Sequence, residues 1–119
     1  MELLGVDHVS VNVKNVPEAI EFYTDVMGMT MRTDRPDFGF GGAWLDAGSQ
    51  QLHLVEGEPP PALGQHFSVL VADIEATIEE LRAHGVQVTD AIAVGPDRQA
   101  FLNDPEGNTI ELHDRGGAR

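Results

Sequence analysis

Two short segments of this chain repeat each other, and this repeat is the strongest constraint on its fold. The segment His8-Val9-Ser10-Val11-Asn12-Val13 aligns with His66-Phe67-Ser68-Val69-Leu70-Val71, and four of the six positions are identical. The spacing from His8 to His66 is the same as that from His53 to Glu111. Because most solenoid repeats are shorter, two copies at this spacing predict a duplicated supersecondary unit rather than an array of repeats.

Each copy has the pattern of a strand followed by a helix and further strands. Alternating, valine-rich segments predict the strands. Asn15 and Asp73 can cap the two helices, which glycines Gly28 and Gly85 would end. The predicted strands are Leu3–Val13, Met29–Thr33, Ala43–Ala47, Gln50–Glu56, Val86–Ala93, Arg98–Asn103 and Asn108–His113, together with the segment that opens the second copy at His66.

The length of 119 residues predicts one domain over residues 1–119. We expect a first module over about residues 3–57, a proline-rich linker over about 58–63, and a second module over about 64–115. The linker prediction rests on Glu58-Pro59-Pro60-Pro61-Ala62, which is too rich in proline for a helix or a central strand. Residues 116–119 are expected to fray.

Composition excludes several kinds of function. A net charge of −13 disfavours binding to nucleic acid or to an anionic membrane. The absence of cysteine rules out disulfides, thiolate metal sites and a cysteine nucleophile. No apolar run reaches the roughly 18 residues of a membrane span. The N-terminal residues lack the pattern of a signal peptide, so we expect a cytoplasmic location.

Four side chains of metal-ligand type fall on the repeat: His8, His53, His66 and Glu111. Strand alternation places each of them on a polar face, opposite valines, leucines and isoleucines that can pack on the helices. A single histidine on such a face would usually point to solvent. Four matching positions at one offset instead favour a site for a divalent transition metal.

Other residues are candidates for a role beside this site. His113 has no counterpart of ligand type, since Val55 occupies the equivalent position of the first copy, so it is expected to line the pocket rather than to bind metal. His84 lies at a helix end and is given no chemistry. The candidates for substrate contact are His113, Arg98, Trp44 and Phe40, with Phe38 as a further aromatic candidate and Arg32 and Arg35 as further anchors for a carboxylate or phosphate.

The sequence resembles the vicinal oxygen chelate superfamily of glyoxalases, bleomycin-resistance proteins and extradiol dioxygenases. The resemblance covers roughly residues 5–114. Its most specific motif is Asp104-Pro105-Glu106-Gly107-Asn108-Thr109-Ile110-Glu111-Leu112. The other matching segments are Asp7-His8-Val9, Ala19-Ile20-Glu21-Phe22-Tyr23, Met27-Gly28-Met29 and Gln65-His66-Phe67.

The resemblance implies an α+β fold of two βαβββ modules whose sheets curl into a cup around a metal. It places His8, His53, His66 and Glu111 on the four metal positions of the family. Bacterial glyoxalase I has a glutamate where this chain has His53, and the methylmalonyl-CoA epimerase has a glutamine. The resemblance also implies a small-molecule substrate and a homodimer.

Three imidazoles and one carboxylate suit Zn, Ni, Co, Fe(II) or Mn, one ion per site. An octahedral ion would keep two positions open for vicinal oxygens of a substrate. The leading hypothesis is therefore a lyase or isomerase that transfers a proton, with Glu111 as the catalytic base and His53 or His113 serving the opposite face. The alternatives are a non-haem Fe(II) dioxygenase and a protein that binds an antibiotic or another small molecule without turnover.

Overall fold

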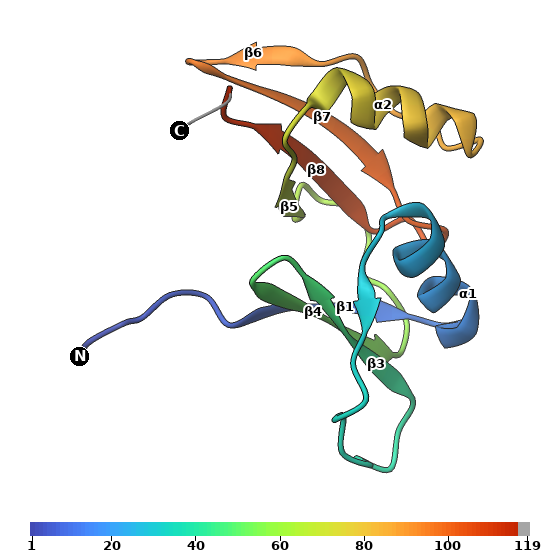
Figure 1. Cartoon of the computed structure of the whole chain (residues 1–119). Helices are drawn as coiled ribbons and strands as arrows, with labels where there is room; N and C mark the ends of the chain where they lie inside the picture. Colours follow the sequence, from blue (N-terminus) through green and yellow to red (C-terminus); the bar gives the residue numbers. More distant parts are fainter. Residues whose placement is uncertain (117–119) are drawn as a thin grey trace. The chain divides into compact units, whose positions relative to one another are not determined.

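The computed structural model describes residues 1–116 as two compact units, one of Met1–Pro60 and one beginning at Pro61 (Figure 1). The division falls within the run of prolines, where the sequence predicts a linker. Of the tail expected to fray, all but Gly116 lies outside the described residues. No helix among residues 1–116 is long and apolar enough to cross a membrane.

The first unit is one mixed sheet with a helix packed against it. The strand order is β1-β4-β3-β2; β1 pairs with β4 in parallel, and the other two pairings are antiparallel. Its elements are β1 (His8–Val13), α1 (Val16–Glu21), η1 (Phe22–Val26), β2 (Thr30–Met31), β3 (Gly42–Ala47) and β4 (Gln50–Glu56).

The second unit repeats this topology. The order β5-β8-β7-β6 again places one parallel pairing, β5 with β8, beside two antiparallel ones. Its elements are β5 (Phe67–Leu70), α2 (Ile74–Ala83), β6 (Ile92–Val94), β7 (Asp97–Asn103) and β8 (Thr109–Asp114). The chain is therefore α+β, with two open four-stranded sheets, each built as βαβββ.

The two parallel pairings have the same register. Ser10 lies opposite His53, and Ser68 lies opposite Glu111, which are equivalent pairs in the repeat. Because a slip of one residue turns every side chain of a strand to the other face, this register determines which side chains share a face. In both units the candidate ligands therefore lie on the face opposite the apolar strand residues.

The helices begin where the sequence predicts and cover the apolar faces. The side chains of Asn15 and Asp73 accept hydrogen bonds of 3.1 Å from the backbone N–H groups of Glu18 and Ala76. Each helix packs on the last two strands of its unit. The buried apolar residues are Val13, Val16, Ala19, Phe22, Tyr23, Met29, Ala43, Leu45, Leu52 and Leu54 in the first unit and Ile74, Ile78, Leu81, Ala100, Leu102, Ile110 and Leu112 in the second.

The first helix differs from the single α-helix that the sequence predicts. After Glu21 it widens into a π-helical turn, in which Met27 N–H donates to the carbonyl of Phe22 at 3.0 Å. The glycines that end the helices, Gly28 and Gly85, both have positive φ, of 77° and 81°. Gly28 and Gly85 are one position closer together in the sequence than His8 and His66. The segment from His8 to Gly28 therefore has one residue more than the segment from His66 to Gly85.

The last strand of each unit returns to the common spacing, whereas β3 and β7 keep the shorter one. Trp44 lies opposite His53 and Phe101 lies opposite Glu111, so the two aromatic residues occupy equivalent positions in their sheets. In the sequence they are one position closer together than His53 and Glu111. The loop between β7 and β8 is closed by Asp104, whose carboxylate accepts hydrogen bonds of 2.9 Å from the backbone N–H groups of Glu106 and Asn108. The motif that carried the family resemblance thus holds the turn that leads into β8.

Three predicted strands are shorter than expected. The strand predicted from Leu3 begins only at His8, and the one predicted over Met29–Thr33 is reduced to β2. The strand predicted over Val86–Ala93 becomes β6, preceded by an isolated bridge between Val88 and Leu102. These strands lie at sheet edges, where pairing on one side alone supports fewer residues.

Candidate metal centre

The first unit brings two of the predicted ligands into contact. The rings of His8 and His53 stack with their centroids 3.8 Å apart and their planes 15° apart. His53 is 9% exposed and also stacks on Trp44, at 4.5 Å between centroids. Burial is the main cause that lowers the pKa of His53, and the neighbouring His8 lowers it further. Both effects favour the neutral imidazole, which is the form that binds a metal.

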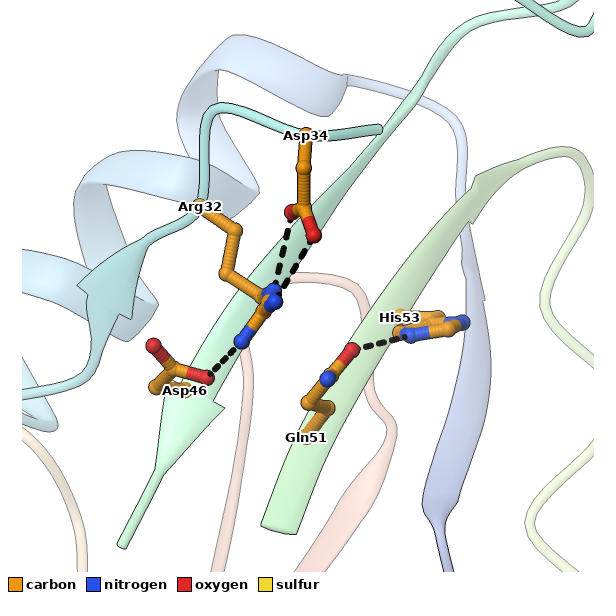
Figure 2. Close-up of polar contacts among 5 residues, drawn as sticks. All are labelled: Arg32, Asp34, Asp46, Gln51 and His53. Atoms are coloured by element: carbon orange, nitrogen blue, oxygen red, sulfur yellow. Dashed lines mark hydrogen bonds and ion pairs between the residues drawn. The ribbon is translucent and has the colours of Figure 1, made fainter. Parts of the chain in front are cut away.

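Each ring of this pair uses one nitrogen in a hydrogen bond. His8 Nδ1 lies 2.8 Å from Asp7 Oδ2, an atom that can only accept a hydrogen bond when the carboxyl is ionised. His53 Nε2 lies 2.9 Å from Gln51 Oε1 (Figure 2). With these N–H groups donating, the lone pairs remain on His8 Nε2 and His53 Nδ1.

The second unit brings together the other two predicted ligands. His66 Nε2 lies 3.1 Å from Glu111 Oε1, and His66 Nδ1 lies 2.9 Å from the carbonyl oxygen of Gly64. The ring of Phe101 meets that of His66 edge to face at 5.5 Å. Burial alone would raise the pKa of Glu111, but hydrogen bonds from His113, His66 and Ser68 outweigh it and lower the pKa.

The hydrogen bonds of His66 leave a conflict that a cation would resolve. A carbonyl oxygen only accepts, so the ring proton of neutral His66 belongs on Nδ1, where it donates to Gly64. The lone pair of Nε2 then faces a carboxylate oxygen of Glu111. Two acceptors at this distance repel each other unless Nε2 is protonated or a metal ion lies at the pair.

The ring of His113 lies between two carboxylates. Its Nδ1 lies 2.8 Å from Glu111 Oε2 and its Nε2 lies 2.8 Å from Asp97 Oδ2. Asp97 and Glu111 raise the pKa of His113, because both carboxylates accept from the protonated ring. With both nitrogens donating, the ring offers no lone pair to a metal and instead orients the carboxylate of Glu111.

The four predicted ligands therefore form two pairs, one in each unit. Among residues 1–116 no three His, Asp or Glu side chains are grouped so as to hold a metal ion. The donors nevertheless have the chemistry that a metal requires. In His8 and His53 one ring nitrogen lies within hydrogen-bond distance of an oxygen, which leaves the other nitrogen for a metal, as is usual in a ligating histidine. In His66 the first nitrogen is held by Gly64 and the second faces Glu111.

The predicted substrate-contact residues have different surroundings. Phe40 is 50% exposed and belongs to the loop before β3, whereas Trp44 lies against His53. Arg98 Nη2 pairs with Glu75 on helix α2. Arg32 donates to both oxygens of Asp34 and to Asp46 (Figure 2). The guanidinium groups of Arg98 and Arg32 are thus already neutralised by carboxylates.

Sequence reasoning missed the residues that support the candidate ligands. Asp7 and Gln51 lie one and two residues before a predicted histidine, so strand alternation offers a signal for Gln51, which shares the face of His53. Asp97 offers no such signal, because its contact with His113 depends on the pairing of β7 with β8.

Comparison with known proteins agrees with this fold. A lactoylglutathione lyase of Arabidopsis thaliana, GLX1, is 32% identical over 92% of this chain and 44% of its own length. The chain spans less than half the length of the first plant relatives. A Vibrio cholerae protein named "probable lactoylglutathione lyase" is 31% identical over 88% of this chain and 86% of its own length.

Solved structures share the architecture. A glyoxalase family protein from Bacillus anthracis superposes with a TM-score of 0.88 at 28% identity, over 98% of both chains. TnmS3, an antibiotic binding protein from Streptomyces sp. CB03234, superposes with a TM-score of 0.81 at 25% identity, over 98% of this chain and 99% of its own. The sequence profile of one family matches residues 5–112. This chain therefore belongs to the Glyoxalase/Bleomycin resistance protein/Dioxygenase superfamily.

Proposed function

We propose that this chain is a glyoxalase-type metalloenzyme, a lyase or isomerase that transfers a proton on a small molecule with vicinal oxygens. The ligands would be His8, His53, His66 and Glu111. The names of the Arabidopsis and Vibrio relatives make formation of S-lactoylglutathione the first activity to assay. A homodimer and a cytoplasmic location stay predictions of the sequence.

The hydrogen bonding of the histidines is the observation that carries this proposal. In His8, His53 and His66 one ring nitrogen is held by an oxygen, and the second nitrogen of His66 faces Glu111, the predicted ligand beside it. In His113, which has no ligand-type counterpart in the repeat, both nitrogens lie beside carboxylates, those of Glu111 and Asp97. This pattern supports the proposal that His8, His53 and His66 are ligands and that His113 orients Glu111. Opposed acceptors on His66 and Glu111 further favour a cation at that pair.

A bound divalent ion would act as a Lewis acid toward two adjacent substrate oxygens and stabilise the negative charge that develops when a proton leaves carbon. The chain's own residues would do the rest. Glu111 is ionised and accepts the proton, while His113 holds its second oxygen and fixes its direction. Trp44, stacked on His53, gives an apolar wall that helps to exclude water.

Elemental analysis of tag-free protein tests the metal site first. We expect about one transition metal per chain in the parent, and less in His8→Ala and in Glu111→Gln. His84→Ala is the matched control, because His84 is an exposed residue at the end of α2 and should leave metal content unchanged. A parent that takes up no metal even after reconstitution would refute the metalloenzyme.

A second candidate function is binding of a small molecule without turnover. The aromatic residues Phe38 and Phe40 are 49% and 50% exposed beside Trp44, and one structural neighbour is an antibiotic binding protein. Tight binding of a ligand by metal-free protein, with no turnover after metal loading, would favour this function over the first.

A further inference from the structure

Arg35 is the most unusual cation of the first unit. The chain carries 20 acidic and 7 basic residues, so nearly every cation can find a carboxylate. Among residues 1–116, Lys14, Arg32, Arg82 and Arg98 each pair with one. Within that range Arg35 has no such ion pair, and neither has Arg115, which is exposed next to the end of the described chain.

Arg35 is nevertheless held in place. Its Nη2 donates to the carbonyl oxygen of Phe40 at 3.0 Å. Its guanidinium carbon lies 5.1 Å from the ring centroid of Phe38 and 5.6 Å from that of Phe40, within the range of cation–π attraction. A Cβ atom added to Gly42 would meet the backbone oxygen of Leu54 and would lie 2.9 Å from Nη2 of Arg35, so the guanidinium lies close against the backbone of Gly42. The group is therefore oriented before any ligand arrives.

A continuous row of rings connects Arg35 to the candidate metal ligands. The rings of Phe38 and Phe40 stack at 5.6 Å, Phe38 contacts Trp44 at 6.1 Å, and Trp44 stacks on His53 at 4.5 Å. Arg35, the aromatic rings and the candidate metal ligand His53 all belong to the first unit. Their arrangement is therefore determined by the sheet and the loop of that unit.

We propose that Arg35, Phe38, Phe40 and Trp44 form a subsite for an organic carboxylate that carries a flat apolar group. The carboxylate would pair with the N–H groups of Arg35 that Phe40 leaves open, and the apolar group would cover the exposed rings. This inference rests on the proposed function, because the vicinal oxygens of the same molecule would face His53. It predicts an elongated substrate with an anionic end.

The chain offers a direct readout of this subsite, because Trp44 is its only tryptophan. The probe is 3-phenylpropionate, titrated against chelator-treated, metal-free protein while the fluorescence of Trp44 is recorded. Its uncharged amide, 3-phenylpropionamide, tests the need for charge. Phenyl phosphate and inorganic phosphate test whether the anion is a phosphate instead.

We expect saturable binding of 3-phenylpropionate, and binding of the amide weaker by about tenfold, the loss of one charge-assisted hydrogen bond. Arg35→Gln should weaken the binding of 3-phenylpropionate by a similar factor and leave the binding of the amide unchanged. Arg82→Gln is the matched control, because this arginine pairs with Asp90 in the other unit and should bind as the parent does.

Equal binding of the acid and the amide, or unchanged binding by Arg35→Gln, would overturn the subsite. Tighter binding of either phosphate would overturn the carboxylate assignment. A concentration-dependent dimer that Phe38→Ser disrupts, with no binding of the acid, would assign these rings to a second copy of the chain instead. A protein that takes up metal but not the acid refutes this inference alone, whereas one that binds the acid but no metal refutes the metalloenzyme alone.

Discussion

The two units share a backbone plan but differ in the chemistry of the pair that each presents. In the first unit, His8 and His53 lie in a stack of rings, and burial and the adjacent His8 lower the pKa of His53, which favours a neutral imidazole. In the second, the carboxylate of Glu111 lies between the rings of His66 and His113. Identical register therefore determines where a side chain lies, while the residues around it determine its charge.

This contrast predicts that the two halves of the proposed site contribute unequally to the reaction. Glu111→Gln and His53→Gln place the same amide at equivalent positions. In metal-loaded protein Glu111→Gln should lower kcat by about 10² to 10⁴, the usual contribution of a general base, and more than His53→Gln does. Steady-state kinetics with matched metal content measures both losses. Equal losses of kcat in the two variants, or undiminished activity of Glu111→Gln, would show that Glu111 is not the catalytic base.

Equivalent substitutions on the apolar faces of the two sheets should have equal effects on stability, whereas those on the polar faces have unequal effects on activity. Leu54 and Leu112 occupy equivalent positions on β4 and β8, and each is 1% exposed. Replacing either by alanine should lower the free energy of unfolding by about 2 to 5 kcal/mol. Urea denaturation followed by circular dichroism measures it, with Leu70→Ala at an exposed position of β5 as a control that changes little. A large effect in one unit only would show that the cores are not equivalent.

The charged contacts of the second unit should make stability depend on pH. The pKa of His113 is raised in the folded protein by Asp97 and Glu111. The contribution of protonated His113 to the free energy of unfolding is therefore complete below its unfolded pKa of about 6.5. It is lost as pH rises through the pKa of His113 in the folded protein. In metal-free protein, His113→Gln should destabilise more at pH 6 than at pH 9. Urea midpoints across this range measure the difference, and a loss that is independent of pH would contradict it.

The smallest expected difference concerns the helix caps. Asn15 and Asp73 accept equivalent hydrogen bonds at the same distance. Alanine at either position should cost about 1 kcal/mol of stability. Thermal denaturation of Asn15→Ala, Asp73→Ala and the conservative Asn15→Asp measures this. Retained stability in both alanine variants would show that the caps matter less than the packing of the helices on the sheets.

Periodicity predicted the features that one chain segment determines by itself. The helix caps and the alternating faces follow from local sequence, and the repeat predicted the equivalence of the units. The shortened edge strands were not predictable, because a strand with one neighbour keeps only the residues that its partner can pair. The same holds for Asp97, which reaches His113 only through the pairing of β7 with β8.

The π-helical turn at Phe22–Val26 absorbs a difference in length between the two halves of the chain. An extra residue in a strand would invert which side chains face the core from that point onward. Placed in a helix, the residue is instead taken up by one wide turn, and the chain leaves at Gly28 much as it leaves the other helix at Gly85. Duplicated halves can in this way gain or lose single residues during evolution without exchanging the inside and the outside of their sheets.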